Sequence, residues 1–302
     1  MLGSNEAGAG LARKPRNDEI DVFGITHPGL VRPSNQDHFL TATLGRELHI
    51  LQTSLPQPLP ELTVIPGLPA TERVAFLAVV ADGVGGNAQG GEASRLAVEE
   101  VTSYIARSLH CFHTVDAAHD VTFREALEEA ARQSHAEILR RASDDATRAG
   151  MATTLTLWIG VWPSAYLLQI GDSRYYLLRG NELTQVSRDQ TVAQDLVDGG
   201  VLAPSAAART PWAHVLSSAL GGTLNVPTVS HVQNDWTAVH LLCSDGLTKH
   251  VPDERIRERL LAMTSARQAC EDLLQDALDG GGRDNITIVV GRALPRSEPA
   301  VA

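Results

Sequence analysis

Short apolar runs recur along the chain and alternate with turn-forming residues. Such runs, bounded by Gly, Pro, Asn or Ser, are typical of buried strands. The segment WPS joins two of them, and Gly180–Asn181 is a hairpin signal between two others. The pattern predicts β-strands at 74–81, 153–161, 165–171, 173–179, 182–186, 238–244 and 286–291.

Four longer segments show the spacing of amphipathic helices. In 124–143, the residues Leu127, Ala131 and Ile138 recur on one helical face. Helices are predicted at 91–109, 124–143, 252–263 and 265–278, the third with Pro252 in its opening turn. Because the strands are mostly hairpin-linked and the helices come in pairs, we expect antiparallel sheets covered by helices, a layered α+β domain.

The ends of the chain differ from its middle. Residues 1–18 and 294–302 are rich in small, charged or proline residues, and they are predicted to be flexible tails around one domain spanning 19–293. The segment 52–72 carries five prolines and is expected to be a surface loop.

Composition narrows the class of protein. The chain has 302 residues, 43% hydrophobic, and a net charge of −11 without a Lys/Arg-rich block, which argues against a nucleic-acid or anionic membrane partner. Its three cysteines are widely spaced, which fits a reducing compartment and provides no thiolate metal site. No apolar run approaches a membrane span, and the N-terminus lacks the apolar stretch of a secretory signal. We therefore expect a cytoplasmic protein.

Aspartates stand repeatedly at the ends of predicted strands. A single Asp-Gly after a strand is usually a turn, and each acid taken alone fits that interpretation. The whole set changes the picture, because strand ends brought together would gather carboxylates that repel one another unless a hard cation neutralises them. Oxygen ligands of this kind favour Mg²⁺ or Mn²⁺. The set comprises Asp37, Asp82, Asp172, Asp245 and Asp284.

Six motifs, five of which contain one of these acids, resemble, in order, those of the metal-dependent Ser/Thr protein phosphatases, the PPM or type 2C family, in its compact bacterial form. They are GLVRPSNQD (29–37), VVADGVGG (79–86), GMATTLT (150–156), IGDSRYYLLRGNELTQVSRDQT (170–191), LCSDGL (242–247) and GGRDNITIVV (281–290). The resemblance implies two antiparallel β-sheets sandwiched between layers of paired α-helices, with a small flap subdomain at about 188–222. This segment is either a mobile flap over the site or an ordinary covered surface subdomain.

The resemblance also implies a role for each motif residue. Asp82 bridges two metal ions, the Gly83 carbonyl binds one, and Asp245 and Asp284 hold the second. Asp172 shares a third, weaker ion with Asp245. Asp37 orients metal-bound water, and Arg32 binds the substrate phosphate. The implied reaction is hydrolysis of phosphoserine or phosphothreonine in proteins phosphorylated by a Ser/Thr kinase, through attack by a water or hydroxide bridging two Mn²⁺ or Mg²⁺ ions, by a monomeric enzyme.

The residues themselves are consistent with that chemistry. Two metal ions can activate water and clamp phosphoryl oxygens, so no protein nucleophile is needed, and no C-x₅-R or D-x-D-x-T motif is present. Arginine suits bidentate phosphate binding. The sequence departs from the family pattern at Gln36, where Glu is usual, and at Val84, where the animal form has histidine. The group that protonates the leaving oxygen is left open.

Three other functions remain as alternatives. A binding module that has lost its metals is disfavoured by the complete acid set. A structural calcium site would place its acids within one loop, whereas these lie far apart. A phosphatase acting on small phosphoesters stays open, because a metal centre recognises phosphate rather than peptide.

Overall fold

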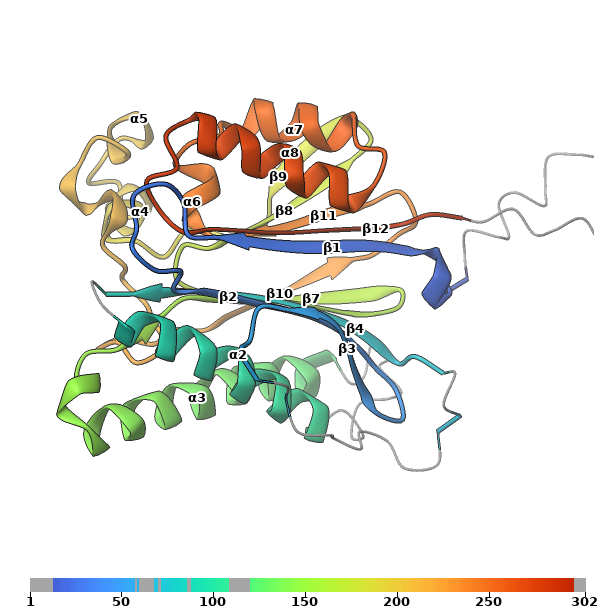
Figure 1. Cartoon of the computed structure of the whole chain (residues 1–302), viewed down its shortest axis with the longest axis horizontal. Coiled ribbons are helices and arrows are strands. Elements are labelled where there is room, and N and C mark those ends of the chain that lie inside the picture. Colours follow the sequence, from blue (N-terminus) through green and yellow to red (C-terminus); the bar gives the residue numbers. More distant parts are fainter. Residues whose placement is uncertain are drawn as a thin grey trace, which may run out of the picture.

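The computed structural model describes residues 13–57, 59, 68–69, 72–85, 88–108 and 120–295. Two β-sheets lie face to face, and a pair of helices covers the outer face of each, so the chain forms four layers (Figure 1). All strand pairs are antiparallel. This confirms the predicted α+β class.

Each sheet draws strands from distant parts of the sequence. The first has the order β1–β12–β11–β8–β9, with β1 Ile20–His27, β8 Arg174–Arg179, β9 Glu182–Gln185, β11 Val239–Cys243 and β12 Ile286–Ala293. The second has the order β10–β7–β6–β4–β2–β3, with β5 paired to β4. Its bounds are β2 Asp37–Leu44, β3 Leu48–Thr53, β4 Ala75–Val84, β5 Ala152–Thr153, β6 Leu155–Val161, β7 Ser164–Ile170 and β10 Thr228–Gln233.

The helices cover the sheets in the predicted pairs. α2 (Ala88–Ser108) and α3 (Asp120–Asp144) pack under the second sheet, and α7 (Asp253–Leu261) and α8 (Ala266–Asp279) pack on the first (Figure 1). Pro252 is the N-cap of α7 rather than a residue of its first turn. The short elements are α4 Val192–Asp198, α5 Pro204–Ala207, α6 Asp245–Thr248, and the 3₁₀ turns η1 Asn17–Glu19, η3 Ala146–Arg148 and η4 Pro211–His214. No helix among the described residues has both the length and the apolar character needed to cross a membrane.

Apolar side chains fill the spaces between successive layers. Leu40, Leu77 and Leu157 face α2 and α3, while Leu241, Ile288 and Leu273 pack between the first sheet and its helices. A third cluster, which includes Phe39 and Trp158, lies between the sheets. Strands of both sheets are thus covered on both faces, which explains their continuous apolar runs.

Four strands lie outside the seven predicted ranges. One is β2, which begins at Asp37, where a strand was expected without bounds, and the other three lie at sheet edges. These are β1, β3 and β10, in which most positions are partly buried or exposed. An edge strand has one paired neighbour and less cover, so its sequence need not form an apolar run. The expected proline-rich loop at 52–72 begins inside β3, and much of its remainder lies outside the described residues.

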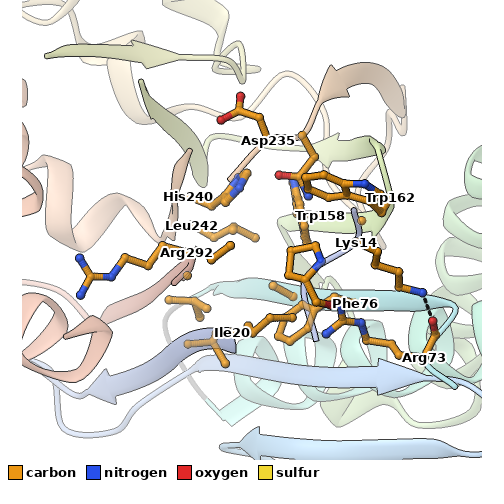
Figure 2. Close-up of a pocket in the computed structure, with 18 residues that line it drawn as sticks. Lys14, Ile20, Arg73, Phe76, Trp158, Trp162, Asp235, His240, Leu242 and Arg292 are labelled. Carbon is orange, nitrogen blue, oxygen red and sulfur yellow. Dashed lines mark hydrogen bonds between the residues drawn. The ribbon is translucent and has the colours of Figure 1, made fainter. Parts of the chain in front are cut away.

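The N-terminal segment contacts the end of the sheets away from the acids. Residues 1–12 of the predicted tail lie outside the described residues. In the rest, Lys14 donates a hydrogen bond to the Arg73 carbonyl, and the Arg13 carbonyl accepts one from Trp236 Nε1 at 2.8 Å. Lys14 also lines a cavity of about 80 Å³ between the sheets, walled by residues such as Phe76 and Trp158 (Figure 2).

Glycine lets the 28–36 loop pack against the turn before β12. Gly29 has a φ of +78°, and a Cβ there would lie 2.2 Å from the Asp284 carbonyl oxygen. Next to it, the Leu30 N–H donates to the Gly282 carbonyl at 2.6 Å. The loop therefore depends on a residue without a side chain at position 29.

We predict that Gly29→Ala lowers the free energy of unfolding by about 3 kcal/mol or more, because it adds a backbone clash to the cost of a left-handed conformation. Gly180→Ala is the matched control, since Gly180 has a φ of +55° with no atom within 4 Å of the added Cβ. It should cost only about 1 kcal/mol. Urea unfolding measures both values, and equal losses would contradict the role of close packing at Gly29.

Candidate metal centre

Two of the predicted acids are direct neighbours in the second sheet. Asp37 is the first residue of β2 and pairs in register with Asp82 on β4. The apolar run predicted that the strand ends before Asp82. In the structure β4 continues to Val84, so Asp82 lies inside the strand. The backbone of Asp82 is fixed by Thr154, whose hydroxyl accepts its N–H at 2.9 Å and whose N–H donates to its carbonyl at 2.9 Å.

The other three acids reach the same end of the sheets from separate connections. Asp172 follows β7, Asp245 begins α6 directly after β11, and Asp284 precedes β12. A cavity of about 220 Å³ is lined by Asp82, Asp172, Asp245 and Asp284, together with Arg32, Gly83 and Lys249. The structure therefore brings the predicted residues together, with Asp37 buried beside Asp82 rather than lining the cavity.

Asp37 is held by two hydroxyl groups. Its Oδ2 accepts hydrogen bonds from Ser244 Oγ and Thr287 Oγ1, both at 2.7 Å, and the residue is only 2% exposed. Burial raises the pKa of Asp37 to about 6, against the opposing effect of the two hydroxyls. Its Oδ1 has no hydrogen-bond partner among the described residues.

Burial and like charge dominate around Asp82 and Asp172. Burial, followed by the charges of Asp37 and Asp245, raises the pKa of Asp82 well above its ordinary value. Burial and the charge of Asp245 raise the pKa of Asp172 to about 8. Simultaneous ionisation of these carboxyl groups is therefore unfavourable unless a cation neutralises part of their charge.

Two basic side chains bind the acids at the rim. Arg32 approaches both oxygens of Asp284, with Nε 2.8 Å from Oδ1 and Nη2 3.0 Å from Oδ2. Lys249 Nζ lies 2.8 Å from Asp284 Oδ2 and 2.5 Å from Asp245 Oδ2. Burial alone would raise the pKa of Asp284, but hydrogen bonds from Arg32 and Lys249 hold it below its ordinary value.

Asn285 joins the two loops that carry these groups. Its Oδ1 accepts the Gln36 N–H at 2.9 Å, and its Nδ2 donates to the carbonyls of Pro28 and Ser34 at 3.0 and 2.9 Å. Gly83 also lies close to the first of these loops, because a Cβ at Gly83 would lie 2.8 Å from the Gln36 carbonyl oxygen. The loop bearing Arg32 is thus fixed against the turn bearing Asp284.

The residues fit a hard divalent cation, although they do not yet surround one. Asp37 Oδ1 and Asp245 Oδ1 are buried without a hydrogen-bond partner, and the donors are oxygens, as Mg²⁺ and Mn²⁺ prefer. Within the described part of the chain, however, no three Asp, Glu, His or Cys side chains are already arranged to hold an ion. Asp245 and Asp284 are turned to Lys249 instead.

Sequence reasoning did not identify four of these contacting residues. Three of them adjoin predicted acids or lie in a predicted strand: Ser244, Asn285 and Thr287. Their position within or beside the motifs is the only sequence feature that could have identified them. Lys249 had a signal in the composition, because it is one of only two lysines in a chain with 23 arginines.

Comparison with known proteins identifies the class. The model of the family "Protein phosphatase 2C" matches residues 69–279. Because this match covers more than half of the chain, the protein belongs to the protein phosphatase 2C family.

Individual relatives agree with that assignment. The serine/threonine protein phosphatase PstP of Mycobacterium tuberculosis is 36% identical over 72% of this chain, but the match spans only 40% of PstP. The serine/threonine phosphatase stp of Listeria welshimeri is 31% identical over 71% of this chain and 83% of its own length. A crystal structure of the PstP catalytic domain with two manganese ions is 30% identical, with a TM-score of 0.67 over 91% of this chain and 99% of that one.

We predict that the chelator-treated protein loses stability as pH rises from about 5 to about 8. The pKa of Asp172 is raised from 3.8 to about 8, so in this window the folded state keeps a proton that the unfolded chain releases. One such proton corresponds to a loss of about 1.4 kcal/mol per pH unit. Asp172→Asn should flatten this slope and raise stability near pH 8.

Asp144→Asn serves as the control, because Asp144 is an acid with its side chain 58% exposed at the end of α3. Urea unfolding across the pH range gives the slopes. The interpretation is wrong if Asp172→Asn and Asp144→Asn keep the same slope as the wild type.

Proposed function

We propose that this protein is a metal-dependent phosphatase that hydrolyses phosphoserine and phosphothreonine in proteins, with Mn²⁺ or Mg²⁺ as its cofactor. The observation that carries the proposal is the convergence of four aspartates and one arginine on a single cavity, over a fifth, buried aspartate. Membership of the protein phosphatase 2C family and the manganese-bound PstP catalytic domain support the same chemistry.

We assign the metal ligands as the sequence motifs predicted. Asp82 and the Gly83 carbonyl would hold one ion, with Asp82 shared by a second that Asp245 and Asp284 bind. Asp172 would contribute to a third, weaker ion with Asp245. When bound, such ions supply an acidified water and neutralise the phosphoryl oxygens. The raised pKa values of Asp82 and Asp172 support the assignment, because both carboxyl groups need a positive partner to ionise.

Two residues would act on the reactants directly. Asp37 is fixed by Ser244 and Thr287 through Oδ2, which leaves Oδ1 to accept a hydrogen bond and orient the attacking water. Arg32 has a side chain that is 46% exposed at the rim, where its planar fork can bind two phosphoryl oxygens. Its bidentate pairing with Asp284 shows that the guanidinium reaches the acids from this loop.

The surroundings of the site favour protein substrates over small phosphoesters. A groove of about 810 Å³ shares Asp172, Asp245 and Asp284 with the metal cavity. One wall comes from the predicted flap, including α4 and α5, and the other from α6 and the turn at Gly280. A peptide segment on either side of a phosphorylated residue would fit such a groove. The role of 188–222 as a flap is part of this proposal.

The remaining features of the proposal concern the cellular setting. We place the protein in the cytoplasm as a monomer, opposing a Ser/Thr kinase. The free, buried thiols of Cys243 and Cys270 support the reducing environment of the cytoplasm.

We expect the purified protein to hydrolyse phosphoserine and phosphothreonine peptides in the presence of Mn²⁺ or Mg²⁺ and to lose activity in excess EDTA. Asp82→Asn should lose nearly all turnover, because it removes the charge shared by both ions. Phosphate release is measured beside that from p-nitrophenyl phosphate. Full activity in EDTA would falsify the metal mechanism, and activity on the small ester alone would overturn the proposed substrate class.

Arg32→Ala should raise KM for phosphopeptides about 10- to 100-fold, which corresponds to the loss of charged hydrogen bonds to phosphate. Arg32→Lys should recover part of this loss, since lysine keeps the charge without the fork. Saturating metal ion removes any contribution from altered metal affinity. Arg132→Ala is the control, because Arg132 is an arginine with its side chain 52% exposed on α3. An unchanged KM for Arg32→Ala would exclude Arg32 from phosphate binding.

A further inference from the structure

Lys249 occupies the position between the two acids assigned to the second metal ion. It lies four residues after Asp245, at the end of α6, and its ammonium bridges Asp245 Oδ2 and Asp284 Oδ2 at 2.5 and 2.8 Å. Although burial opposes it, the two carboxylates raise the pKa of Lys249 above its ordinary value, so the group is a cation. A side chain that is only 26% exposed is thus held by charge on both sides.

The same contacts keep the acids from surrounding an ion. Asp245 and Asp284 each direct their Oδ2 atom at Lys249. Among the described residues, no three Asp, Glu, His or Cys side chains are arranged to hold an ion. A divalent ion and an ammonium cannot both lie between these carboxylates, because like charges at such distances repel strongly. Arg32 is a lesser obstacle, since within the described part of the chain its ion pair is with Asp284 only, and its side chain is 46% exposed at the rim.

The groove beside the acids offers the Lys249 side chain an alternative position. Lys249 lines both the 220 Å³ cavity over the acids and the 810 Å³ groove beside it. Lysine is a compact charge on a flexible four-carbon stem, so it can leave one cavity for the other without moving the backbone. Asp245 Oδ1, which is buried without a hydrogen-bond partner, would then be available to coordinate an entering ion.

We propose that Lys249 is a built-in competitor for the second metal ion, whose ammonium neutralises Asp245 and Asp284 until a divalent ion displaces it into the groove. This inference rests on the proposed metal ligands. It makes Lys249 a residue that sets metal affinity. By linkage, any change that favours the bridging position of the ammonium weakens binding of the metal ion. Binding of the ion disfavours that bridging position by the same factor.

The composition of the chain allows a direct test. Lys249 and Lys14 are its only lysines, and Lys14 contacts the Arg73 carbonyl at the opposite end of the sheets. Reductive methylation with ¹³C-formaldehyde gives each lysine a separate NMR signal while keeping its charge. On titration with diamagnetic Mg²⁺, the Lys249 signal should move as the metal sites fill, and the Lys14 signal should stay. This measurement uses the wild-type protein, so it does not depend on a variant that folds.

Calorimetric titration with Mg²⁺ and Mn²⁺ tests the consequence for affinity. Lys249→Met keeps roughly the length of the side chain without its charge. This variant should increase the affinity for the second metal ion about tenfold or more. Lys249→Arg keeps a competing cation and should bind metal much as the wild type does, as should Lys14→Met. In chelator, Lys249→Met should also unfold more easily, because its two acids lose their cation.

The outcomes separate this inference from the proposed function. If Lys249→Met binds metal no more tightly than Lys14→Met, or if the Lys249 signal does not move while Mg²⁺ fills the sites, the competition is excluded. A wild-type protein that binds neither ion would refute the metal-ligand assignment itself. Metal binding that displaces Lys249 without any phosphatase activity would support the competition and refute only the activity.

Discussion

Repulsion among carboxylates confined to one end of the two sheets is the constraint on which the site depends. Burial raises the pKa of Asp37 to about 6 and that of Asp172 to about 8, so the cluster cannot carry its full charge alone. Four neighbouring polar side chains offset part of this charge. Ser244 and Thr287 donate to Asp37, and Arg32 and Lys249 bind Asp284.

The fold makes this concentration of charge tolerable by fixing the backbone around it. Asp37 and Asp82 are paired across two strands in which most residues are buried, so the main chain at each acid is held in place. Asn285 ties the neighbouring loop to the same region through three hydrogen bonds. A fixed set of acids with incomplete compensation is what a divalent ion stabilises, since its binding energy offsets the repulsion that folding leaves behind.

Much of the fold could be predicted from local sequence pattern, and the errors fall where that pattern is weak or interrupted. The seven predicted strands and four predicted helices are present in the structure. They could be predicted because strands buried on both faces give continuous apolar runs, and helices buried on one face give apolar residues at helical spacing. The edge strands β1, β3 and β10 were missed, since their partial cover leaves no such spacing. The end of β4 was placed too early because Asp82 interrupts the apolar run without ending the strand.

The sequence by itself determined the family, the layered architecture and which acids converge, because each aspartate lies within a motif that can be recognised from the order and spacing of its residues. Only the tertiary structure decided how their charges are balanced. It placed Asp37 beneath the cavity instead of on its wall, and it brought Lys249 onto Asp284, 35 residues away. Ion pairs of this kind follow from the packing of α6 against the turn before β12, and no local pattern records which cation a carboxylate will meet.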